Sequence, residues 1–123
     1  MNVQAFVQEM FQVDSSIRYI GIVDSDYRIL VSQQRDGIPS LTSDETTHNF
    51  VSIVPQIIVE SVDKMAGFLG RVSGITAHYE KALLVFYAYA NMIVIISFQP
   101  EVATPFYSRI TEAFNKLSSH YLS

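Results

Sequence analysis

The chain has 123 residues, 49% of them hydrophobic and 16% charged, which predicts a single folded domain over 1–123 and excludes a disordered chain. The net charge is −4, and the eight Lys and Arg residues are scattered with no two adjacent, which argues against nucleic-acid binding and a polybasic membrane anchor. The absence of cysteine excludes disulfides, thiolate nucleophiles and Cys-ligated zinc.

The first part of the chain predicts a helix followed by a β-hairpin. Apolar residues recur there at i, i+3, i+4, i+7 and i+8: Val3, Phe6, Val7, Met10 and Phe11. This spacing is typical of an amphipathic helix, which we expect to end near Asp14. Two β-branched and aromatic runs, 17–23 and 27–32, flank the turn cluster 24–26 and predict two paired strands.

A long helix is expected next. Thr42 followed by Glu45 fits a capping box, in which the glutamate satisfies the N–H of the capping residue. The helix should run to about Ala66, with Gly67 as its stop. Pro55 lies inside it and removes one backbone hydrogen bond, so the helix should be kinked or split there.

The remaining residues predict three strands and a final helix. The strands are expected over 68–79, 83–89 and 92–99, and the last two are apolar on both faces, so layers should cover both sides of the sheet. Thr104 followed by Pro105 is a helix start. The order is α-β-β-α-β-β-β-α, which defines an α+β domain with three helices to cover two sheet faces.

This order resembles that of the roadblock/LC7 domain, which has a profilin-like fold. The stretches 17–24 (IRYIGIVD) and 79–81 (YEK) also look like an uncharacterised archaeal family of roadblock-like proteins. The resemblance implies a five-stranded antiparallel sheet with the long helix on one face and the other two helices on the opposite face. It also implies homodimers, no catalytic residues, and service as a scaffold, often for small GTPases. A PAS sensor is the main rival, because Pro55 could create its short helices between the second and third strands.

No catalytic, cofactor or metal site is expected, so we predict that the chain is not an enzyme. His48, His78 and His120 fall on separate elements without ligand spacing. The cluster 24–26 lacks the glycine and the distal glutamate of a calcium loop. The chain also contains no nucleophile elbow and no phosphate-binding loop.

Two charged positions have alternative interpretations. Arg18 begins a strand and either pairs with a carboxylate or extends off the end of the sheet, although it could bind an anionic group. Glu80 and Lys81 lie at a strand junction, where they either protect the strand end or mark an edge that binds a partner.

The long helix carries more apolar surface than one sheet face requires. Its apolar residues sweep about 180° of arc, whereas packing on one sheet needs a stripe only somewhat above ~100°. We expect one set to face the sheet: Phe50, Ile53, Val54 and Ile57. The rest would form a flank: Val51, Pro55, Ile58, Val59 and Val62.

An exposed apolar flank invites association, so the sequence predicts a homodimer. If the strand order is roadblock-like, the third strand is an edge whose one strongly charged interior residue is Arg71, and it can pair with another chain. The alternative is that the long helix is buried more deeply within one protomer.

The leading hypothesis is therefore a non-enzymatic protein-interaction module without cofactors, a dimeric scaffold or regulator of a small GTPase. The alternative is a PAS-like small-molecule sensor with a pocket between the long helix and the sheet. Because the N-terminus lacks a basic stretch followed by an apolar run, we expect no signal peptide and a cytoplasmic protein.

Overall fold

The computed structural model describes residues 1–57, 64–100 and 108–123 in full, and residues 58–63 and 104–107 by their backbone alone. The elements follow in the order α1 (Val3–Val13), β1 (Ile17–Val23), β2 (Ile29–Gln34), α2 (Asp44–Val62), η1 (Asp63–Met65), α3 (Ala66–Leu69), β3 (Gly74–His78), β4 (Leu83–Tyr89), β5 (Met92–Phe98) and α4 (Thr104–Tyr121). None of the described helices is long and apolar enough to cross a membrane.

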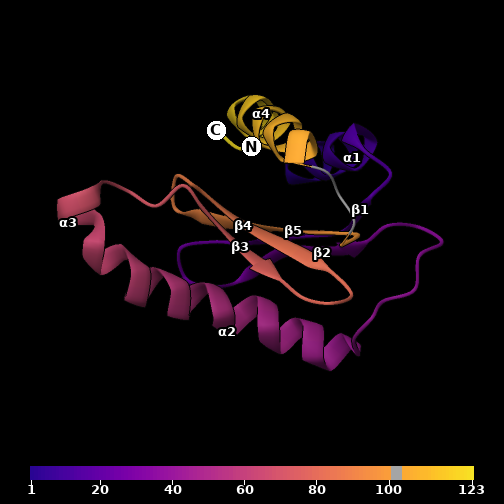
Figure 1. The fold of residues 1–123 in the computed structure, drawn as a ribbon, viewed down its shortest axis with the longest axis horizontal. Coiled ribbons are helices and arrows are strands. Elements are labelled where there is room, and N and C mark those ends of the chain that lie inside the picture. The colour runs from indigo at the N-terminus through magenta and orange to yellow at the C-terminus, as the bar shows by residue number, and fades with distance from the viewer. Residues whose placement is uncertain (101–103) are drawn as a thin grey trace.

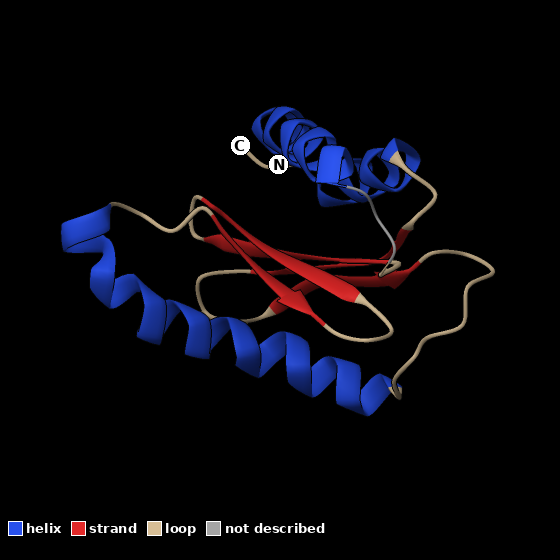
Figure 2. Ribbon diagram, in the orientation of Figure 1, coloured by secondary structure: helices blue, strands red, loops and turns tan. Residues whose placement is uncertain are grey.

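The strands form one five-stranded antiparallel sheet in the order β2-β1-β5-β4-β3. Helix α2 lies along one face of this sheet, and α1 and α4 lie side by side on the other (Figures 1 and 2). This arrangement confirms the α+β architecture predicted from the order of elements, and it places β2 and β3 at the two edges.

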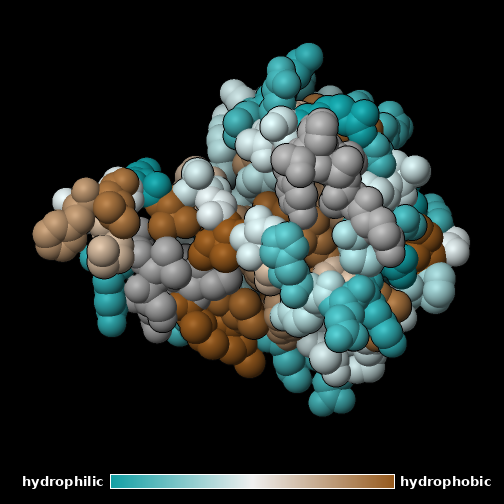
Figure 3. Space-filling view, viewed as in Figure 1, coloured by the Kyte–Doolittle hydropathy of each residue, from teal (hydrophilic) through white to brown (hydrophobic). Residues whose placement is uncertain are grey.

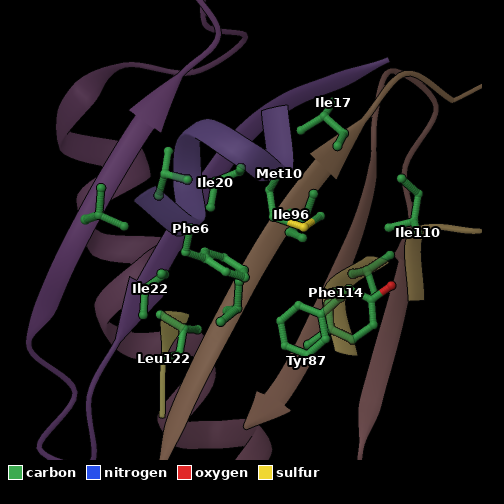
Figure 4. Packing of buried hydrophobic residues seen from close by; sticks show 14 of the residues in the cluster. Phe6, Met10, Ile17, Ile20, Ile22, Tyr87, Ile96, Ile110, Phe114 and Leu122 are labelled. Carbon is green, nitrogen blue, oxygen red and sulfur yellow. The ribbon is translucent and has the colours of Figure 1, made fainter. Parts of the chain in front are cut away.

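The larger core lies between the sheet and the α1–α4 pair. The apolar stripe of α1 supplies Phe6 and Met10, both fully buried against the central strands (Figure 4). Phe114 of α4 joins them, because its ring stacks on that of Tyr87 with centroids 4.2 Å apart and meets the ring of Phe6 edge-on. Offset and edge-on ring pairs stabilise a core by ~0.5–1.5 kcal/mol beyond the area they bury.

A smaller cluster lies on the opposite face, beneath α2. It contains five buried side chains: Tyr19, Val23, Val51, Phe86 and Ile95. Among these, α2 contributes Val51, and the partly buried Phe50 and Val54 pack beside it. The Phe50 ring lies 6.0 Å from that of Phe86. In the described part of α2, the contact with this cluster is made by Phe50, Val51 and Val54.

The region after α2 differs from the sequence-based expectation. The long helix ends at Val62, not near Ala66, and residues 66–69 form α3, although a strand was predicted from residue 68 onward. The reason is Gly70, which has φ +84° and donates its backbone N–H to Ala66 O. Glycine adopts this left-handed geometry without strain, so it ends a helical turn and delays β3 until residue 74.

Two smaller boundaries also move, and one expected break is absent. The capping residue of α2 is Ser43, whose Oγ accepts from Thr46 N at 3.1 Å, one position beyond the expected Thr42. Strand β2 starts at residue 29 because Tyr27 has φ +60° and belongs to the turn. Helix α2 continues through Pro55 as a single helix. A series of short helices like that expected for a PAS domain is therefore not formed at Pro55.

Candidate interaction surface

The expected division of α2 is only partly correct, because Phe50 and Val54 pack on the sheet as predicted but four other residues are reversed. Val51 is 1% exposed and Pro55 is also buried, whereas Ile53 and Ile57 are 53% and 56% exposed. Residues four apart lie ~40° apart around a helix, and residues two apart lie ~200° apart. Val51 and Pro55 therefore lie on one side of α2, and Ile53 and Ile57 lie on the opposite side. The prediction that Val51 and Pro55 form an exposed flank was wrong, as was the sheet-facing assignment of Ile53 and Ile57.

The other expected interface residues have different outcomes. The side chains of Ile58, Val59 and Val62 lie outside the described residues. Arg71 is exposed, but it lies in the connection between α3 and β3 and not inside the edge strand.

Exposed apolar side chains lie on the described part of α2 and on the two short helices after it. These residues, which we call the outer apolar surface, are Ile53, Ile57, Met65, Phe68 and Leu69. Phe68 and Leu69 are 86% and 76% exposed, and hydrophobic atoms gather over α3 and along α2 in Figure 3. Single exposed apolar residues are ordinary, but a group of them on neighbouring elements is typical of a protein–protein contact.

Sequence reasoning missed Phe68 and Leu69, because a strand was predicted there. The signal that could have identified them is Gly70, placed directly after four residues with no β-branched member. Such a segment suits a last helical turn closed by glycine more than the start of a strand.

Strand β3 borders the sheet with one side unpaired by any described strand. It pairs with β4 and with no second strand in the described part of the chain. Residues 74–78 contain no Pro, Lys, Arg, Asp or Glu. Natural sheets usually protect exposed edges with such residues, so this edge is open to pairing with another strand.

A cavity of about 380 Å³ lies beneath the first turns of α2, where several chain segments meet. Tyr19 and Ile95 lie in the sheet beneath it, Phe50 comes from α2, and Arg18 and Lys81 contribute the two cationic side chains. The hydroxyl of Tyr19 is hydrogen-bonded to Ser32 Oγ at 2.7 Å, and burial raises the pKa of this phenol. Sequence reasoning allowed a pocket between the helix and the sheet, but it did not identify these residues as its lining.

The three histidines are not brought together. They are exposed on α2, β3 and α4. Among the fully described residues, no group of three or more His, Asp or Glu side chains is arranged to hold a metal ion.

Comparison with solved structures places the fold. The chain superposes on the Roadblock/LC7 domain from Streptomyces avermitilis with a TM-score of 0.70, 5% identity and full coverage of both chains. It matches a structure described as MglB with tetrameric arrangement with a TM-score of 0.72, 11% identity, and coverage of 96% of this chain and 85% of that one. For the LokiProfilin2/rabbit actin complex, the TM-score is 0.58, the identity 11%, and the coverage 95% and 96%.

No family model matches the sequence, and no curated protein matches it either. At these identities, the likeness concerns the fold. The chain therefore has a roadblock/LC7-like, profilin-like fold, as its order of elements predicted.

Proposed function

We propose that this chain is a non-enzymatic protein-interaction module that forms a homodimer and acts as a scaffold or regulator of a small GTPase. The observation that carries the proposal is the outer apolar surface on α2, η1 and α3, together with the open edge of β3. The proposal that the partner is a small GTPase rests on the resemblance to roadblock domains. A cytoplasmic location and an archaeal source remain predictions.

The energetics of the outer apolar surface favour association of two copies. Fully burying an Ile side chain contributes ~1.5–3 kcal/mol, and Ile53 and Ile57 each still expose about half of that area. In a symmetric dimer both residues occur twice, so complete burial would contribute roughly 3–6 kcal/mol. That gain corresponds to about two to four orders of magnitude in the dissociation constant.

The fold comparisons support a role in binding other proteins. The neighbours include one structure described as a tetrameric arrangement and one described as a complex with actin.

Light scattering after gel filtration tests the dimer. At tens of micromolar, we expect twice the protomer mass of 13.9 kDa for the wild type. Ile57→Asp should give a folded monomer, because burying an unpaired carboxylate at an interface costs several kcal/mol. Leu30→Asp is the matched control, since Leu30 is a partly exposed apolar residue on β2, at the other edge of the sheet. A monomeric wild type would contradict the proposed dimer.

The GTPase partner is tested separately. The immobilised wild-type chain is incubated with an extract of its native cell, with GDP or a non-hydrolysable GTP analogue added, and the retained proteins are identified by mass spectrometry. We expect one small GTPase to be enriched with one of the two nucleotides and to bind less to Ile57→Asp. If the dimer retains no GTPase with either nucleotide, the proposed GTPase partner is contradicted, although the dimer is not.

A further inference from the structure

The cavity beneath α2 has the size and lining of a small-molecule site. Its volume of about 380 Å³ lies within the range of ~300–1,000 Å³ that is typical of ligand pockets. Its apolar part comes from Phe50 and Val51 of α2, Leu84 of β4 and Ile95 of β5. These four side chains come from a helix and two strands, and Leu41 of the loop before α2 also lines the cavity, so its shape depends on the packing of α2 on the sheet and on this loop.

We propose that this cavity binds a small amphipathic carboxylate, with its apolar body against Phe50, Leu84 and Ile95 and its carboxylate held by Arg18 and Lys81. This site lies within one protomer and does not depend on the proposed dimer.

The charged side chains that line the cavity favour an anionic ligand. The described lining contains two cations, Arg18 on β1 and Lys81 in the turn between β3 and β4, and no Asp or Glu, although the whole chain carries a net charge of −4. Arg18 donates one hydrogen bond, from Nη2 to Pro39 O at 3.2 Å, and no described ion pair involves either cation. A guanidinium has five N–H donors, so Arg18 can still bind a carboxylate.

The dimensions restrict the rest of the ligand. At about 30 Å³ per water-sized group, the cavity holds roughly a dozen such groups. A straight chain of about ten carbons that ends in one carboxylate has this size. The lining also includes hydroxyl-bearing residues, namely Tyr19, Ser40, Thr42, Thr46, Thr47, Tyr79 and Ser97, but most of its exposed surface is apolar. A ligand with an apolar body and one polar end suits such a lining.

Decanoate, kept below its micelle-forming concentration, is the probe that tests the site. Calorimetric titration into the full chain should show saturable binding with one decanoate per protomer. Decylamine and decan-1-ol have the same apolar chain but no negative charge, and we expect both to bind at least about tenfold more weakly. Equal affinity for the three compounds, or no saturable binding of decanoate, would overturn the proposal.

Variants and a direct contact measurement locate the binding. Arg18→Gln and Lys81→Gln should each weaken decanoate binding by about tenfold, whereas Arg28→Gln, an exposed arginine beside Asp24 and Asp26, should leave it unchanged. Each variant is checked by circular dichroism and thermal melting before titration.

Intermolecular nuclear Overhauser effects provide the second readout, which needs no substitution. We expect contacts from decanoate methylenes to the methyl groups of Leu84 and Ile95. Contacts to Ile57 and Leu69 instead would show detergent-like adsorption on the outer apolar surface and would overturn the site, as would unchanged affinity in the Arg18→Gln, Lys81→Gln double variant.

Discussion

Replacing Gly21 by alanine would crowd the tight packing of Tyr19 on the sheet face beneath α2. A Cβ added at Gly21 would lie 2.7 Å from Tyr19 Oη and 3.0 Å from its Cε1, which is closer than such atoms normally approach. The ring cannot move freely, because Tyr19 is 7% exposed and its hydroxyl is bonded to Ser32 Oγ. Gly21→Ala must therefore displace a packed aromatic ring.

The net cost follows from two opposing effects. Overpacking a core position costs ~1–3 kcal/mol. The loss of glycine flexibility in the unfolded chain offsets ~0.4–1 kcal/mol of that. We therefore expect Gly21→Ala to lower the free energy of unfolding by about 1–2 kcal/mol and the melting temperature by roughly 3–10 °C. Gly67→Ala is the matched control, because a Cβ there meets nothing within 4 Å, and it should be neutral or slightly stabilising.

The assay is urea denaturation followed by circular dichroism at a fixed protein concentration, since a dimer makes stability depend on concentration. A double-mutant cycle with Tyr19→Phe isolates the contact, because phenylalanine lacks the oxygen that would lie 2.7 Å from the new methyl group. The cost of Gly21→Ala should fall by about 1 kcal/mol in that background. A cost that is the same in both backgrounds, or no cost at all, would refute the reasoning.

Three further predictions concern α2, the N-terminal hairpin and pH. Val51→Ala should lower the free energy of protomer unfolding by about 2–3 kcal/mol, because Val51 is buried. Ile57→Ala, at a half-exposed position, should change it by less than ~0.5 kcal/mol in dilute monomer. Equal effects of the two substitutions in urea titrations would argue against the observed orientation of α2. Arg35→Met should lower the free energy of unfolding by about 2–4 kcal/mol, because the guanidinium donates hydrogen bonds to the carbonyls of Phe11, Asp14 and Ile17. Arg28→Met should lower it by under ~0.5 kcal/mol. Equal melting temperatures for the two variants would contradict this prediction. Since burial raises the pKa of Tyr19 above its usual 10.0, the native chain keeps this proton when the unfolded chain loses it, so the associated stability is fully present below pH 10.0 and is lost as pH rises through the native pKa. In chemical denaturation from about pH 9 upward, through the usual value of 10.0 and beyond, Tyr19→Phe should show a shallower loss of stability than the wild type. Parallel curves would count against the shift.

Local sequence patterns determined the elements whose signals lie entirely within a short segment. The helix at the N-terminus follows from the 3.6-residue spacing of its apolar residues, and the strand over residues 83–89 was predicted with the bounds that the structure shows. These patterns also indicated layers on both faces of the sheet, and hence the fold. They did not reveal α3, because this helical turn is closed by the positive φ of Gly70, and glycine at 67 was an equally good candidate for a stop.

The tertiary structure alone decided which side of α2 meets the sheet. The apolar arc of this helix is wide enough to pack in either orientation, so its periodicity cannot distinguish Val51 from Ile57. The choice is made by the surface beneath it, where Phe86 and Ile95 form one cluster with Val51 and leave Ile57 exposed. The cavity has the same origin, since Arg18, Lys81 and Ile95 are far apart in sequence and come together only when β1, β4 and β5 pair beneath α2.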